Sequence, residues 1–211
     1  ISYTYDLVSG NVNEVHYQDG EEDQFHHKYV YDQENRITDV FTSNDGVIWK
    51  NDARHFYYEH GPLARMELGD DNVQGVDYAY NIHGWIKGVN STVLDPKNDM
   101  GHDGGKNFAR DAFSYGLSYY NKDYISIGQN NWIANQKGTG MDNAELFNGN
   151  IRNMTTSIDP FMDPHGSFGT KYTYDQLNRI KTMESFQGLD KTTNSWSITN
   201  NSGMTGSQRT I

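Results

Sequence analysis

Short runs of alternating apolar and polar residues, each ending in a tight turn, recur along this chain. In residues 29–32 the two tyrosine rings fall on one face of an extended strand, and the residues that follow them point to the other. Turn-forming residues occupy positions 33–36, a return strand begins at Ile37, and a further turn is expected at residues 43–46. The pattern therefore predicts a β-hairpin followed by a turn that leads into the next hairpin.

The same phrase is repeated: a tyrosine-led strand, an acidic or amide residue, a turn and then an aliphatic residue. Strong copies begin at Tyr3, Tyr29, Tyr78 and Tyr172, and weaker copies begin at Phe56 and Leu146. We place the tyrosines that open the first successive copies at Tyr5, Tyr31, Tyr58 and Tyr80. A period of about 25 residues is typical of arrays in which each unit needs its neighbours to bury its apolar face. The turn of the first copy is one residue longer, which predicts a bulge or a wider loop there.

We interpret residues 1–211 as a single segment of such an array. Repeats cover about 3–91 and 145–188, an insertion covers about 92–144, and the tail at 189–211 matches the repeat poorly. The chain starts at Ile1, already inside a copy, so we expect it to be a fragment of a longer polypeptide.

Inside the insertion and the tail, weaker patterns predict isolated elements. Residues 114–120 alternate like a strand, and residues 107–115 have a spacing that allows one or two helical turns at most. In the tail, residues 196–198 are consistent with one more strand.

Composition supports an all-β fold whose interior is built from aromatic rings. Hydrophobic residues make up only 35% of the chain and mean hydropathy is −0.85, yet aromatic residues reach 13%, with 15 tyrosines. Tyrosine and tryptophan bury a large area while keeping a polar group near water. Disorder fits less well, because disordered chains are poor in aromatic residues.

Charge and cysteine content exclude several classes of function. The net charge of −11 argues against nucleic acid and against anionic membrane surfaces as partners. No apolar run approaches the length of a membrane-spanning helix, so the chain is not expected to cross a membrane. With no cysteine, disulfide scaffolds and zinc–thiolate sites are excluded.

The best candidate metal site is an acidic, glycine-rich stretch in the insertion. Calcium requires several oxygen ligands, often from alternate aspartates beside a glycine. The candidate residues are Asp95, Asn98, Asp99, Gly101, Asp103 and Gly104, with Asp95, Asp99 and Asp103 as the carboxylate ligands. The stretch lacks the glutamate that completes an EF-hand loop, so an ordinary glycine-rich loop without calcium is the alternative.

Four tryptophans are candidates for stacking against sugar rings: Trp49, Trp85, Trp132 and Trp196. Structural packing is the alternative for each of them. No nucleophile elbow, phosphate loop or dinucleotide fingerprint is present. Acidic pairs such as Asp70–Asp71 are better explained as charged turns, so we predict that the segment is not an enzyme and needs no cofactor, apart from the calcium considered above.

The repeats resemble the YD (tyrosine–aspartate) repeats of Rhs-type proteins, the bacterial relatives of the teneurin shell. The family phrase is roughly Tyr-x-Tyr-Asp-x-x-Gly-Arg-Leu, followed later by glycine. The copies at 29–37 and 172–180 match it nearly position by position, with asparagine in the place of the turn glycine. The copy at 78–86 has Asn81 for aspartate and Trp85 for arginine. Parts of the chain look like long Rhs proteins of the Bacteroidetes type.

The resemblance implies a β-spiral, in which hairpins pair edge to edge and wind into a hollow cocoon with both sheet faces wetted. It assigns architectural roles to particular residues. Tyr5, Tyr31, Tyr80 and Tyr174 are expected to pack the wall, Asp6, Asp32, Asn81 and Asp175 to cap turns, and Gly46 and Gly84 to supply turn geometry.

The function that the resemblance implies is structural. The segment would belong to a secreted or bacterial cell-surface protein that encloses or presents a C-terminal toxin or effector. Its partners would then be further repeats and the C-terminal domain of the same polypeptide, with secretion-machinery or surface proteins as further possible partners. The alternative is an adhesin or binding module, carried as secretion-system cargo, that holds a glycan or a protein with exposed aromatic residues such as Trp49 and Trp85.

Overall fold

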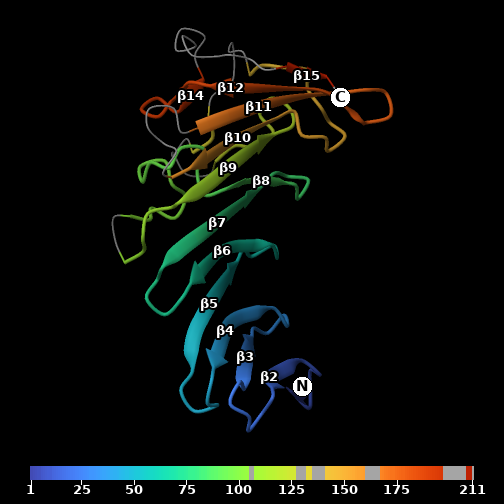
Figure 1. Cartoon of the computed structure of the whole chain (residues 1–211). Helices are drawn as coiled ribbons and strands as arrows, with labels where there is room; N and C mark the ends of the chain where they lie inside the picture. The colour runs from blue at the N-terminus through green and yellow to red at the C-terminus, as the bar shows by residue number, and fades with distance from the viewer. Residues whose placement is uncertain (105–106, 127–131, 135–140, 160–166, 197–207, 211) are drawn as a thin grey trace. The chain divides into compact units, whose positions relative to one another are not determined.

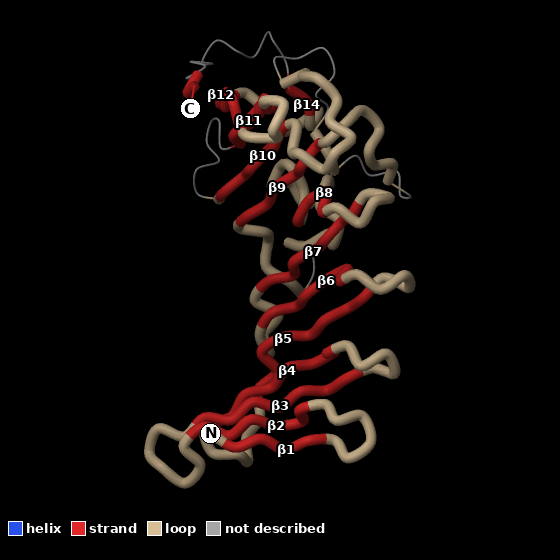
Figure 2. The backbone as a smooth tube through the Cα atoms, turned by 90° about the vertical axis from the view of Figure 1, so that its right-hand side faces the viewer, coloured by secondary structure: helices blue, strands red, loops and turns tan. Residues whose placement is uncertain are grey.

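A computed structural model describes residues 1–104, 107–126, 132–134, 141–159, 167–196 and 208–210. Every regular element in these ranges is a β-strand (Figure 2), which confirms the predicted all-β class. The helical turns expected within 107–115 are wrong, because none of these residues is helical and an alternating strand begins at Phe113. Within the described ranges, no helix has the length and apolar character needed to cross a membrane.

The chain separates into two compact units, residues 1–76 with 107–109, and residues 77–106 with 110–211. The strands of the first unit are β1 (Ser2–Tyr5), β2 (Val12–Tyr17), β3 (Phe25–Tyr31), β4 (Ile37–Ser43), β5 (Lys50–Tyr57) and β6 (Leu63–Leu68). From β1 to β6, consecutive strands pair antiparallel (Figure 1), as the hairpin pattern predicts. Exposed and half-buried residues alternate strictly in β5, so its two faces differ only in degree of exposure.

The second unit is also an antiparallel meander. Its strands are β7 (Gln74–Tyr80), from residue 77 onward, β8 (Ile86–Val89), β9 (Phe113–Ser118), β10 (Asn153–Ile158), β11 (Ser167–Tyr174), β12 (Ile180–Gln187) and β15 (Gln208–Thr210). Two short strands, β13 (Leu189–Asp190) and β14 (Ser195–Trp196), pair separately. Among the described strands, the sheet order does not close on itself, since β1 and β15 each have a single neighbour. The tail strand expected at 196–198 is seen as β14 up to Trp196, and residues 197–198 lie outside the described ranges.

The predicted insertion consists of two long connections separated by β9. One runs from β8 to β9 and the other from β9 to β10. Figure 2 shows these loops beside the strands of the second unit, whereas the loops of the first unit lie at its strand ends. The hydrophobic core joins the insertion and the tail to Phe186 of β12; its members are Val93, Ala134, Met141, Phe186, Leu189 and Trp196.

A row of small residues lets the inserted loops approach the sheet. The row runs in direct register through Ala79, Gly88, Gly116, Thr155 and Gly169, one residue on each of β7 to β11. A Cβ atom at Gly116 would lie 2.5 Å from Cγ2 of Thr92, and one at Gly169 would lie 2.7 Å from Sδ of Met141. Only glycine permits such close approach. One face of this sheet is therefore covered, so the expectation that both faces are wetted is wrong for the second unit.

Candidate functional site

The strong hairpins turn through one shared loop, which begins at Asp32, Asn81 or Asp175. A side-chain oxygen of this first residue accepts hydrogen bonds from the backbone N–H groups two and four residues later, at 2.8–3.0 Å. In the loop at Asp32 the donors are Glu34 and Arg36. The backbone N–H of Arg36 is the main reason that the pKa of the Asp32 carboxyl lies below its usual value. The loop closes through a second bond, from Asp32 N–H to the Arg36 carbonyl at 2.9 Å.

The fourth residue of this loop adopts a left-handed backbone conformation. Its φ is 60° at Asn35, 77° at Gly84 and 60° at Asn178. Asparagine tolerates this region better than other residues with a side chain, which explains why it replaces glycine here. Gly46 supplies the same kind of conformation, with φ of 68°, in the turn between β4 and β5.

The first copy has the longer loop that its sequence predicts. Asp6 N–H bonds to the carbonyl of Asn11, one residue further on than in the other loops, and the Asp6 carboxylate accepts N–H groups of Val8 and Ser9. The strand register shifts beside this loop, between Thr4 and Tyr5. A shift in the same place occurs in the other hairpins built on the shared loop, so the bulge belongs to the repeat rather than to the longer loop.

The third copy requires a correction of alignment. Tyr57, not Tyr58, occupies the position of Tyr31, since Tyr57 is the last residue of β5 and Tyr58 begins the loop. Pro62 stands where the other loops have an N–H donor, and proline has none. A capping aspartate at position 58 would therefore lose one of its two backbone donors, which gives a physical reason for tyrosine there.

Tyrosine hydroxyls connect four of the hairpins to the hairpin before them. The hydroxyl donates to a backbone carbonyl at the start of the return strand of the preceding hairpin, or two residues before it in the case of Ile151. The bonds are Tyr31 to Val12 at 2.8 Å, Tyr57 to Ile37 at 2.7 Å, Tyr119 to Ile86 at 2.8 Å and Tyr174 to Ile151 at 2.8 Å. Burial raises the pKa of all four tyrosines, to about 12 for Tyr119, so the donor proton is retained well above neutral pH.

A second set of contacts joins neighbouring loops. A residue one to three positions before a return strand reaches the left-handed residue of the next loop. Asn11 donates to the side chain of Asn35 at 2.9 Å, and Asn150 donates to that of Asn178 at 3.0 Å. The Arg36 guanidinium lies 4.5 Å from the centre of the Tyr57 ring, a cation–π distance. Each hairpin thus carries contacts that specify its neighbour.

The tyrosines predicted to pack the wall differ in exposure. Tyr31, Tyr80 and Tyr174 are half-buried. Tyr5 is 56% exposed, because it lies on β1, which pairs only with β2 among the described strands.

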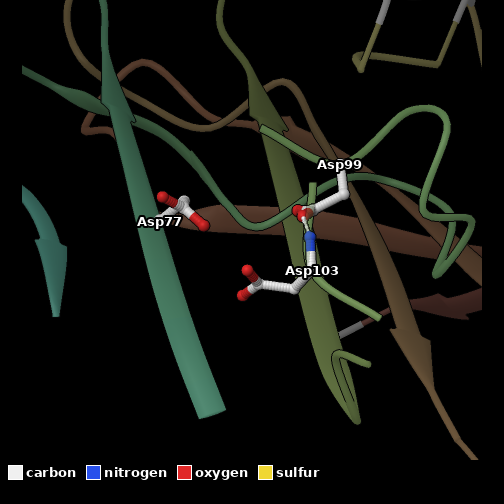
Figure 3. Close-up of side chains that lie close together, drawn as sticks. All are labelled: Asp77, Asp99 and Asp103. Atoms are coloured by element: carbon white, nitrogen blue, oxygen red, sulfur yellow. Dashed lines mark hydrogen bonds between the residues drawn. The ribbon is translucent and has the colours of Figure 1, made fainter. Parts of the chain in front are cut away.

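Three buried aspartates meet in the second unit (Figure 3). Asp77 extends from β7, and Asp99 and Asp103 lie in the connection to β9; one carboxylate oxygen from each lies within 4.8 Å of the others. Their exposed fractions are 7%, 2% and 3%. The sequence named Asp99 and Asp103 together with Asp95, but Asp95 is not in this group and accepts the backbone N–H of Lys97 at 3.0 Å. The arrangement provides only oxygen donors, which suits a hard divalent cation.

The four candidate sugar-stacking tryptophans fall into two classes. Trp132 and Trp196 are 2% and 4% exposed, so their assignment as stacking residues is wrong. Trp49 is half-buried, with the Lys28 ammonium 5.6 Å from its ring centre. Trp85 is also half-buried, 5.1 Å from the Tyr119 ring.

A buried ion pair fastens β8 to the loop after β9. Lys87 Nζ lies 2.8 Å from a carboxylate oxygen of Asp123 and 3.2 Å from Oγ of Ser118. Burial lowers the pKa of Lys87, and the carboxylate of Asp123 opposes that shift. Asp123 also accepts the backbone N–H of Tyr119 at 2.9 Å. Since these partners are all internal, we interpret the pair as structural.

Sequence reasoning missed Asp77, Tyr57 and Tyr119. Asp77 shares the buried face of β7 with Gly75 and Ala79. A carboxylate at an inward-facing position of the strand pattern was therefore the feature of the sequence that could have indicated it. Tyr119 was hidden because its hairpin is split by the long loop between β9 and β10.

No protein-family model matches the chain, and no curated protein is similar enough to it to count as a match.

Proposed function

We propose that this chain is a non-catalytic wall segment of a secreted or cell-surface Rhs-type repeat protein that encloses or presents a C-terminal effector. The observation that carries the proposal is the tyrosine link between consecutive hairpins. Tyr31 reaches the hairpin before it and Tyr57 reaches the hairpin of Tyr31, by bonds of 2.8 and 2.7 Å. Because the same contact can form between any two consecutive hairpins, it can hold together a wall of any number of hairpins.

The polar character of the first unit supports containment. Its described residues include only two buried side chains, His26 and Ser43. Such a sheet owes its stability to lateral pairing more than to a core, which is what a hollow wall requires. In the proposed shell, further repeats of the same polypeptide pair with β1 and leave no free strand edge there.

The test uses the parent polypeptide from its native source. Proteomic sequencing should find further tyrosine–aspartate copies that lead into an unrelated C-terminal domain. Limited proteolysis should then digest that domain at least about tenfold more slowly in the whole protein than when the domain is produced alone, because opening the wall requires local unfolding. Absence of further copies, or equal digestion rates, would contradict containment.

An adhesin is the second candidate, and exposed apolar loop tips favour it. Leu7, Val8, Ile82 and Leu177 all lie in hairpin loops and are between 71% and 100% exposed. Scattered exposed apolar residues are common, so this observation ranks below the tyrosine link. Glycan or cell-surface binding that disappears in Trp49→Ala but survives in Ile48→Ala would favour the adhesin.

A further inference from the structure

We propose that Asp77, Asp99 and Asp103 bind a calcium ion that fastens the connection between β8 and β9 to strand β7. The proposal does not depend on the proposed function, since it concerns the internal assembly of the second unit. It follows from the spacing of the carboxylates, from one buried oxygen that has no donor, and from the chemistry of the ligands.

The spacing of the three carboxylates fits a single ion. Calcium coordinates oxygen at about 2.3–2.6 Å, so two oxygens on one ion lie no more than about 5 Å apart. The three aspartates each offer an oxygen within 4.8 Å of the other two. In Figure 3 their carboxylates face a common space, although Asp77 comes from a strand more than twenty positions earlier in the chain.

Asp99 supplies an independent indication that a ligand belongs there. Its Oδ2 accepts the backbone N–H of Asp103 at 2.7 Å, whereas its Oδ1 is buried and has no hydrogen-bond partner. The residue is only 2% exposed. A buried carboxylate oxygen without a donor is strongly destabilising, because its hydrogen bonds to water are lost on folding and no protein donor replaces them. A cation between the carboxylates would satisfy this oxygen and also offset the repulsion among like charges.

The surrounding backbone holds the ligands from two sides. Asp77 and Asn90 are joined by two bonds of 2.8 Å, from Asp77 N–H to the Asn90 side chain and from Asn90 N–H to the Asp77 carbonyl. On the other side, the Arg110 guanidinium donates to the carbonyl of Leu94 at 2.9 Å. The ion would therefore connect a fixed strand to a loop that is already anchored at both ends.

Calcium fits these ligands better than the other common divalent cations. The site has only oxygen donors and the chain has no cysteine, which disfavours zinc. Magnesium keeps most of its water and demands a near-octahedral shell, which a dry site of three carboxylates does not provide. The site offers only three carboxylates and is not an EF-hand loop, so we expect weak but saturable binding, with a Kd of about 10⁻⁴–10⁻³ M.

The experiment is calorimetric titration of the whole chain with calcium chloride after removal of metal by a chelator. Asp99→Asn keeps the shape of the side chain and the acceptor for Asp103 N–H but removes the charge. Asp95→Asn is the matched control, because it removes an aspartate from the same connection but outside the group. We expect saturable binding to the wild type and to Asp95→Asn, and at least about tenfold weaker binding to Asp99→Asn, as loss of a charged ligand should produce. Failure of the wild type to bind calcium, equal binding by Asp99→Asn, or tighter binding of magnesium would overturn the proposal.

Thermal unfolding separates a metal site from a purely structural role of Asp99. In chelator, Asp99→Asn should unfold at the same temperature as the wild type or higher, because one of three neighbouring like charges is gone. Saturating calcium should raise the unfolding temperature of the wild type and Asp95→Asn, but not that of Asp99→Asn. If Asp99→Asn unfolds at a lower temperature even in chelator, and calcium leaves the wild type unchanged, the carboxylate is structural and the proposal fails. Asp77→Asn serves as a second variant with the same expectation.

Discussion

The first and second units are made from the same hairpin but are stabilised differently. In the first unit, both faces of the sheet stay partly exposed, and His26 and Ser43 are the only described residues with a buried side chain. In the second unit, the inserted loops and the tail cover one face through the row of small residues and enclose a core that includes Met141 and Trp196. The comparison teaches that the repeat itself specifies lateral pairing, and that a core appears only where extra chain is added.

The largest expected difference between the units concerns tryptophan. Trp196→Ala should reduce the free energy of unfolding by about 3–5 kcal/mol, the usual loss for a large buried side chain. Trp49→Ala, in the first unit, should cost about 1 kcal/mol, since both its ring and its cation–π partner Lys28 are only half-buried. Urea unfolding gives the two energies, and hydrogen exchange resolved by peptide shows which unit opens. Equal losses would mean that the first unit has a core of its own.

Whether a feature of the two units could be predicted from the sequence depends on how far apart its residues lie along the chain. Local features were predictable. The alternation of residues predicted the hairpins, and Asp32 and Asn35 indicated the capped turn between their strands. The covered face was not, because it depends on Gly88 and Gly116 meeting in register across strands that are far apart in sequence. The acidic group was found only in part for the same reason. Asp99 and Asp103 are close in sequence, whereas Asp77 joins them only through the fold.

A smaller effect is expected for the tyrosine link, and it should be equal in the two units. Tyr31→Phe in the first unit and Tyr174→Phe in the second each remove one hydroxyl bond of 2.8 Å to a backbone carbonyl. Each should lower the free energy of unfolding by about 1 kcal/mol, the net value of a typical hydrogen bond. Tyr29→Phe is the control, because the Tyr29 ring stacks on His27 and the change leaves that contact in place. A loss confined to one unit would show that the link is not a common property of the repeat.

The smallest effect is a difference in resistance to alkali, which follows from the tyrosine pKa values. Burial raises the pKa of Tyr119, in the second unit, from 10.0 to about 12. The folded-state pKa of Tyr119 lies above its unfolded-state pKa. The contribution of this hydroxyl to the free energy of unfolding is therefore fully present below pH 10 and is lost as the pH rises from 10 through 12. The neutral hydroxyl is also the donor to Ile86, so ionisation removes the bond that links the residue directly after β9 to the start of β8.

Tyr119→Phe tests this pH dependence directly. The variant should be less stable than the wild type at pH 8, where it lacks the hydroxyl bond, and the two stabilities should converge as the pH approaches 12, where the wild type loses that bond as well. Unfolding temperature measured across this range, with tyrosinate absorbance as the record of ionisation, gives both curves. A constant gap between them at every pH would mean that the Tyr119 hydroxyl has the same pKa in the folded and unfolded states, which would contradict the raised pKa that burial gives it.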